Sequence, residues 1–75
     1  MNLQEAKVDS VVKVIKIEGN NELRRRFLDL GIITGTKIKV LFASPLGDPR
    51  AYLVRGTVLA IREEEGEKIK VSNIK

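Results

Sequence analysis

The chain has 75 residues, enough for one domain spanning residues 1–75. It contains no histidine and no cysteine, which excludes thiol catalysis, imidazole acid–base chemistry and Cys/His metal sites; we therefore expect no enzyme, no cofactor and no metal site. Its 14 basic residues exceed its 10 acidic ones, and the net charge of +4 admits nucleic acid, anionic lipid or an acidic protein face as a partner.

The distribution of apolar residues argues against membrane insertion. No apolar stretch approaches the ~20 residues that a membrane span requires. The first five residues, MNLQE, lack the apolar run of a signal peptide or an anchor. We therefore expect a cytoplasmic protein that meets a membrane only indirectly, through a partner.

Residues 10–17 (SVVKVIKI) predict the first strand. The segment is rich in β-branched residues and is bounded by Asp9 and Gly19. Val12 and Val14 fall on one face, and further apolar residues occupy the other. This pattern indicates a strand with one side in a small core and the other side partly covered.

A helix of about ten residues follows this strand. Asn20 or Asn21 can cap its start, because an asparagine side-chain oxygen accepts a backbone N–H of the first turn. Leu23, Phe27 and Leu30 recur at helical spacing, and we place all three in the core. The glycine directly after Leu30 is the residue type that helices favour just past their end.

Four further strands are expected after the helix. We place them at residues 36–42, 51–55, 57–62 and 68–71. In the first of these the alternation puts Ile38, Val40 and Phe42 inward. Five short strands and one inserted helix cannot bury a flat sheet in so short a chain. We therefore predict a mainly β fold that closes into a small barrel.

The helix carries a candidate partner-binding site. Leu28 lies ~100° around the helix from Phe27, off the apolar stripe and flanked by Arg24 and Arg25. A hydrophobic side chain rimmed by arginines is typical of protein contacts. The alternative is that Leu28 only widens the core face. We expect Arg24, Arg25 and Leu28 to bind a partner.

The turn at residues 44–49 is a second candidate. Its two prolines fix φ and lower the cost of ordering on binding, while its glycine permits a turn that presents Leu46 and Asp48. The alternative is an ordinary hairpin loop. We expect Leu46, Asp48 and Pro49 to contribute to partner binding.

The same segments are those in which the chain resembles a known family. From residue 23 to residue 71, about two-thirds of its length, it is similar to the ferrous-iron-transport protein A (FeoA) family. Each motif is short, but the ordered set is specific. The matching segments are 23–31 (LRRRFLDLG), 35–36 (GT), 45–49 (PLGDP), 54–56 (VRG), 59–62 (LAIR) and 69–71 (IKV).

The resemblance implies an SH3-like β-barrel with the helix inserted after the first strand. It also implies a cytosolic accessory protein of bacterial or archaeal ferrous iron uptake. The implied partner is the FeoB-type membrane permease, which has a cytosolic G-protein domain. Nothing in the composition or spacing points to iron, which enters only through the resemblance.

Three alternatives remain open. The chain is also compatible with a repressor-type SH3-like domain or a basic barrel that binds nucleic acid, although it lacks the exposed aromatic residues of a stacking platform. A metallochaperone would use Asp48 with the acidic residues at 63–67. An uncovered strand edge would allow two copies to associate.

Overall fold

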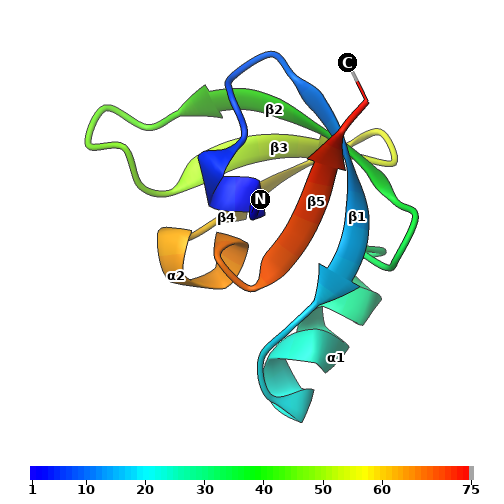
Figure 1. Ribbon diagram of the computed structural model, residues 1–75. Helices are drawn as coiled ribbons and strands as arrows, with labels where there is room; N and C mark the ends of the chain where they lie inside the picture. Colours follow the sequence, from blue (N-terminus) through cyan, green and yellow to red (C-terminus); the bar gives the residue numbers. More distant parts are fainter. Residues whose placement is uncertain (75) are drawn as a thin grey trace.

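The structure, a computed structural model, describes residues 1–74. It consists of five strands and three short helices (Figure 1). Their bounds in chain order are η1 Leu3–Glu5, β1 Val11–Ile17, α1 Asn21–Asp29, β2 Lys37–Ala43, β3 Arg50–Val54, β4 Thr57–Ile61, α2 Glu63–Gly66 and β5 Ile69–Asn73.

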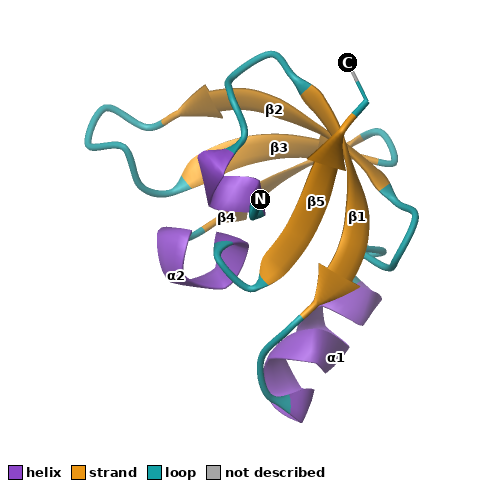
Figure 2. Cartoon of the chain, viewed as in Figure 1, coloured by secondary structure: helices purple, strands orange, loops and turns teal. Residues whose placement is uncertain are grey.

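The strands form one antiparallel sheet in the order β4-β3-β2-β1-β5. Figure 2 shows the sheet curling around a common interior, with α1 beyond one end of β1 and α2 between β4 and β5. The expected mainly β architecture with a helix after the first strand is confirmed. The sheet is not closed by hydrogen bonds, because β4 and β5 remain its two edges.

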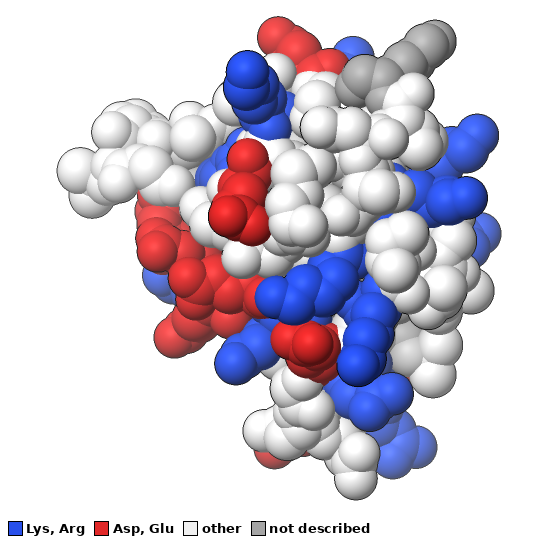
Figure 3. Space-filling model, in the orientation of Figure 1, with Lys and Arg blue, Asp and Glu red and all other residues white. Residues whose placement is uncertain are grey.

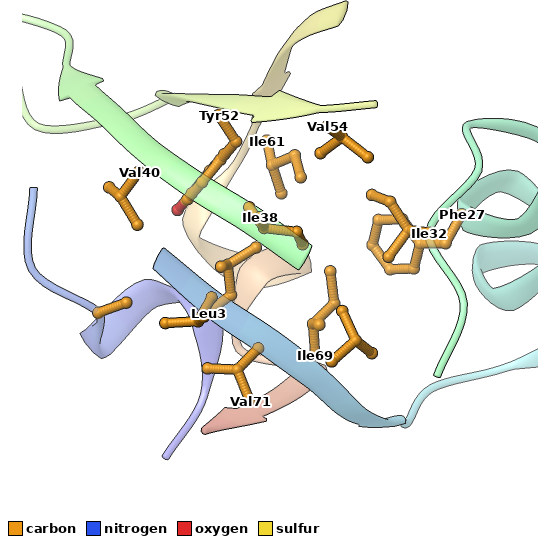
Figure 4. Packing of buried hydrophobic residues seen from close by; sticks show 13 residues of the cluster. Leu3, Phe27, Ile32, Ile38, Val40, Tyr52, Val54, Ile61, Ile69 and Val71 are labelled. Atoms are coloured by element: carbon orange, nitrogen blue, oxygen red, sulfur yellow. The ribbon is translucent and has the colours of Figure 1, made fainter. Parts of the chain in front are cut away.

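The core fills the concave side of the sheet. Tyr52 and Phe27 are its largest fully buried side chains, and Leu3 of η1 enters it from the N-terminal segment (Figure 4). The alternation expected for β2 holds for Ile38 and Val40, which are both buried. Every strand therefore contributes its inward face to a single apolar cluster.

Phe42 does not join this cluster, contrary to the expectation from β2 alternation. Its side chain is 58% exposed. The register between β2 and β3 pairs Val40 with Tyr52 but Phe42 with Ala51, so an extra residue on β2 forms a bulge between them. The bulge reverses the faces beyond it and turns Phe42 outward.

Leu30 is likewise not a core residue, as it is 37% exposed at the end of α1. Gly31 has a φ of 84° and donates its N–H to the Leu28 carbonyl at 2.9 Å, and Ile32 donates to the Phe27 carbonyl at 2.9 Å. This pair of bonds is a Schellman motif, which folds the chain back over the last turn. Ile32 therefore packs beside Phe27 in place of Leu30 (Figure 4).

The helices η1 and α2 were not expected. In η1, Asn2 accepts from the Glu5 N–H at 3.1 Å, and the Glu5 carboxylate accepts from the Asn2 N–H at 2.8 Å. This reciprocal cap compensates for the short length of η1. In α2, three consecutive glutamates occupy the first turn, where the helix dipole favours negative charge.

Candidate partner-binding surface

The position of α1 fixes which of its side chains face outward. Asn20 caps the helix, its side-chain oxygen accepting the backbone N–H three residues along at 2.8 Å. Phe27 is fully buried and holds one face of α1 against the barrel. The part of α1 that faces away from the barrel exposes Arg24, Arg25 and Leu28, as predicted, and Leu28 is 60% exposed.

These three residues share a groove of about 690 Å³, termed here the α1 groove. Within the described part of the chain no carboxylate and no aromatic ring lines it. Its cations are Lys16, Arg24 and Arg25, so it suits a partner with acidic and apolar side chains. Its lining residues are Lys16, Ile17, Asn21, Arg24, Arg25, Leu28, Ile32, Ile33 and Thr34.

Six residues that line the α1 groove were not predicted from the sequence, and two of them, Lys16 and Ile33, add to its charge and its exposed apolar surface. The sequence does mark Lys16, because it is a cation in the otherwise apolar end of its strand. No sequence pattern marks Ile33, because its 43% exposure follows from the turn that the chain makes after α1. Together they extend the apolar floor and the cationic rim beyond the helix.

Arg26 differs from its two neighbours. Its guanidinium forms an ion pair with Glu65 of α2, on a different side of the helix from the α1 groove. Glu65 also accepts the backbone N–H of Arg62 at 3.2 Å. The three consecutive arginines therefore divide into two that line the α1 groove and one that ties α1 to α2.

The β2–β3 loop presents Leu46 at its tip, where the side chain is 95% exposed. Asp48 is half-buried, and its Oδ1 accepts the backbone N–H of Glu63 at 2.9 Å. Pro49 is also half-buried and follows a cis peptide bond. Leu46 is thus free to meet a partner, whereas Asp48 is already engaged in holding the start of α2.

The two groups of predicted contact residues do not form one continuous surface. Figure 1 places the β2–β3 loop and α1 at different ends of the molecule, with α2 between them. Contacts from Arg26 to Glu65 and from Asp48 to Glu63 attach α2 to both. The predicted contact residues therefore form two separate patches, and α2 connects them.

The acidic residues of α2 gather around a small hollow of about 350 Å³, and Figure 3 shows this acidic region beside α2. Arg62 lies in the hollow with Asp48, Glu63, Glu64 and Glu67. Among residues 1–74, no cluster of three or more His, Cys, Asp or Glu residues could hold a metal ion. Within the same residues, no helix has the length and apolar character to span a membrane.

Comparison with known proteins identifies the family. The model of the FeoA domain matches residues 1–73. The chain belongs to the FeoA domain family. The match includes the N-terminal residues that lie before the segment in which the sequence motifs resemble this family.

Individual relatives agree with this assignment. Over 74 residues the chain is 31% identical to a protein of Porphyromonas gingivalis described as an Fe(2+) transport protein A/Fe(2+) transporter FeoB fusion protein. The alignment covers 99% of this chain and 9% of that relative, so the chain spans less than a tenth of its length.

Solved structures show the same fold. The FeoA protein of Chlorobium tepidum is 37% identical with a TM-score of 0.93, covering 100% of this chain and 71% of that one. The FeoA of Stenotrophomonas maltophilia, complexed with zinc and described as a procaryotic SH3 domain protein, is 25% identical with a TM-score of 0.83. That match covers 96% of this chain and 89% of the other.

Proposed function

We propose that this protein is a cytoplasmic, non-catalytic accessory factor of ferrous iron uptake that binds and modulates a FeoB-type permease. The observation that carries the proposal is the fusion protein of Porphyromonas gingivalis, in which a chain similar to this one is joined to a FeoB transporter. Fusion keeps two modules at a high effective concentration. A module that acts on the transporter benefits from this arrangement, and a module that is not fused would reach the same partner by affinity.

We assign the principal contact to the α1 groove. Arg24 and Arg25 form no ion pair within residues 1–74, so their charges are available to a partner. Leu28 supplies an exposed apolar anchor between them. Apolar anchors surrounded by arginines account for much of the affinity of protein interfaces. The groove would accept an acidic, apolar segment of the permease's cytosolic part.

The test is the double charge reversal Arg24→Glu/Arg25→Glu. Both side chains are exposed, so the fold should be retained while affinity for the purified cytosolic part of the permease falls by about tenfold or more. Lys37→Glu/Lys39→Glu on β2 is the matched control, since it changes net charge equally away from the groove. Unchanged affinity of the α1 variant in a binding titration would refute this assignment.

The β2–β3 loop is proposed as a second, separate contact made by Leu46, Asp48 and Pro49. Leu46→Ser is the clean probe, because Leu46 projects into solvent and Asp48 is needed by α2. In the same titration, a loss of affinity that adds to that of the α1 variant would indicate two independent patches. No loss would remove the loop from the interface.

A nucleic acid partner predicts a different result. Binding through Arg24 and Arg25 to phosphates would weaken steeply with salt and would appear in a gel shift at low salt. Phe42 is an exposed aromatic residue that the sequence reading had placed in the core, but it lies on β2 and not in the α1 groove. We therefore favour the protein partner, and a salt-dependent DNA shift lost in the α1 variant would overturn that choice.

A further inference from the structure

The two edges of the sheet are treated differently by the rest of the chain. The edge at β5 is covered: Asn2 forms a bridge with Lys70, and Val71 donates its N–H to the Met1 carbonyl at 2.8 Å. The edge at β4 has no such cover within residues 1–74. This makes β4 the edge at which another strand can add.

The sequence of β4 does nothing to discourage such pairing. Exposed edge strands in natural proteins usually carry a charge, a proline or a bulge that blocks association. β4 reads TVLAI, with no charged residue and no proline, and its register with β3 runs without a bulge from Arg50–Ile61 to Val54–Thr57. Val58, at 59% exposure, shows that this strand is open to solvent.

The hairpin geometry determines which backbone groups point outward. β3 and β4 are joined by Arg55 and Gly56, both with positive φ (51° and 80°), as in a two-residue hairpin turn. In such a hairpin the residues flanking the turn share hydrogen bonds, so Thr57 points its N–H and C=O toward β3. Alternation then directs the N–H and C=O of Val58 and Ala60 away from the sheet.

We propose that a second copy of this chain pairs with β4, antiparallel, about a two-fold axis through Leu59. In this register Val58 of each copy exchanges hydrogen bonds with Ala60 of the other. Leu59 lies opposite its own counterpart. The interface is isologous, as expected for a symmetric dimer.

Charges at the ends of β4 select this occupant and direction. In the antiparallel arrangement the β3–β4 turn of one copy, which carries Arg55, lies beside the start of α2 of the other copy, which carries Glu63, and the symmetry repeats this contact. A parallel arrangement would instead place Arg55 beside Arg55 and Glu63 beside Glu63. The strand is therefore complementary to itself in one direction only.

The outer face of the sheet supports the same arrangement. Ala60 pairs with Ala51, which in turn pairs with the exposed Phe42, so these residues form an outward row across three strands. Val58 belongs to the neighbouring row with Leu53. In the dimer, Val58 of one copy continues the Phe42 row of the other, which covers apolar surface left exposed in the single chain.

The first experiment uses the absence of cysteine from the natural chain. In a non-hydrogen-bonded antiparallel pair the two Cα atoms lie ~4.5 Å apart, within the range of a disulfide. Leu59→Cys should therefore form a covalent dimer under mild oxidation, about tenfold faster than Val8→Cys, an exposed control outside the sheet. Equal rates for the two variants would overturn the proposed register.

A second experiment leaves Leu59, which is partly buried against the core, intact. Sedimentation of the natural chain over a range of concentrations should show a monomer–dimer equilibrium. Val58→Lys should weaken this equilibrium by about tenfold or more, since it places a charge on the edge, while Val8→Lys should leave it unchanged. A natural chain that stays monomeric, or a dimer that Val58→Lys does not weaken, would overturn the proposal.

The charged residues that flank β4, Arg55 and Glu63, allow a charge-reversal test. Arg55→Glu alone should weaken the dimer, and the combined Arg55→Glu/Glu63→Arg should restore it because the pair is rebuilt with opposite signs. Arg55 also donates its Nε–H to the Gly31 carbonyl at 3.1 Å, so thermal melting of both variants checks the fold. Failure of the double variant to recover dimerisation would exclude the antiparallel register. These measurements need no permease and are independent of the proposed function.

Discussion

Arg50 is the one buried charged residue among residues 1–74. It is 7% exposed at the start of β3, and its Nη1 and Nη2 donate to the carbonyls of Gln4 and Ala6, each at 2.5 Å. The guanidinium also lies over the Tyr52 ring, 5.7 Å from its centroid. One side chain thereby fastens the N-terminal segment to the barrel.

Replacing Arg50 by methionine keeps most of the side-chain volume but removes both donors. The carbonyls of Gln4 and Ala6 would then be left without these bonds, and we expect the free energy of unfolding to fall by about 3 kcal/mol. Urea denaturation measures the loss. The exposed Arg25→Met is the control and should change stability by less than about 0.5 kcal/mol. Equal midpoints for the two variants would contradict this role.

Tyr52 predicts a pH dependence. Burial raises the pKa of its phenol above the ordinary value of 10.0; nearby Arg50 acts to lower this pKa and Asp48 acts to raise it. The folded protein therefore keeps the phenolic proton at a pH where the unfolded chain has lost it. This contribution to stability is present below about pH 10 and is lost as pH rises toward the folded-state value.

The Tyr52→Phe variant isolates this effect. The hydroxyl has no hydrogen-bond partner within residues 1–74, so its removal should cost little stability at neutral pH. Between about pH 8 and about pH 11 the natural chain should lose more free energy of unfolding than the variant, while lysine titration affects both equally. Identical pH profiles in urea denaturation would show that the phenol does not contribute.

At the scale of elements, α2 is the helix to which both α1 and the β2–β3 loop are attached. It has only four residues, and Arg62 at its N-cap makes no side-chain capping bond. Asp48, distant in sequence, supplies the missing acceptor to Glu63. Arg26 of α1 binds α2 from the other side through Glu65. The helix is therefore stabilised by its neighbours more than by its own length.

A pair of substitutions tests the cap provided by Asp48. Asp48→Ala removes the acceptor and should lower the free energy of unfolding by about 1 kcal/mol, as loss of an N-cap does. Asp48→Asn retains a side-chain oxygen and should remain within about 0.5 kcal/mol of the natural chain. Thermal or urea unfolding compares the three proteins. Equal losses for Ala and Asn would assign the effect to charge, not to the cap.

The local sequence pattern predicted where the strands and the main helix lie better than it predicted which side chains point inward. The positions of Phe27, Ile38 and Val40 followed from periodicity alone, and these residues are buried. Phe42 and Leu30 were placed wrongly because a bulge and a Schellman turn each change the phase of the chain. Neither the bulge nor the Schellman turn can be recognised from the alternation of apolar and polar residues.

The roles of Arg50 and Asp48 could not be predicted from the sequence. Both residues bind backbone groups far away along the chain, at Gln4 and Ala6 in one case and at Glu63 in the other. Such contacts depend on how the sheet curls, which no local pattern specifies. By contrast, exposure of Arg24, Arg25 and Leu28 followed from helical register alone.

At the scale of the whole molecule, charge is distributed unevenly. Acidic side chains gather over α2 (Figure 3), whereas Lys16, Arg24 and Arg25 line the α1 groove. The molecule measures 30 × 26 × 23 Å. At an ionic strength of about 0.01 M the Debye length of about 30 Å spans the whole protein, while at about 0.15 M it shrinks to about 8 Å. Salt therefore controls how far this asymmetry acts.

If the proposed partner presents an acidic face to the α1 groove, its association rate should depend on salt. We expect the rate constant for binding the permease's cytosolic part to fall by about tenfold or more from about 0.01 M to about 0.15 M ionic strength. The Arg24→Glu/Arg25→Glu variant should show a flat or inverted dependence. Stopped-flow or surface-based kinetics measures both, and parallel slopes would argue against steering by these arginines.

The N-terminal contacts determine the smallest piece of the chain that can fold alone. Leu3 fills the core, Arg50 grips the backbone of Gln4 and Ala6, and Met1 accepts a bond from β5. Removing residues 1–6 would open the barrel and leave the buried guanidinium of Arg50 without its two hydrogen-bond acceptors. The stretch from residue 23 to residue 71 that carries the family motifs therefore does not fold on its own, and a shortened protein must retain residues 1–6 to stay folded.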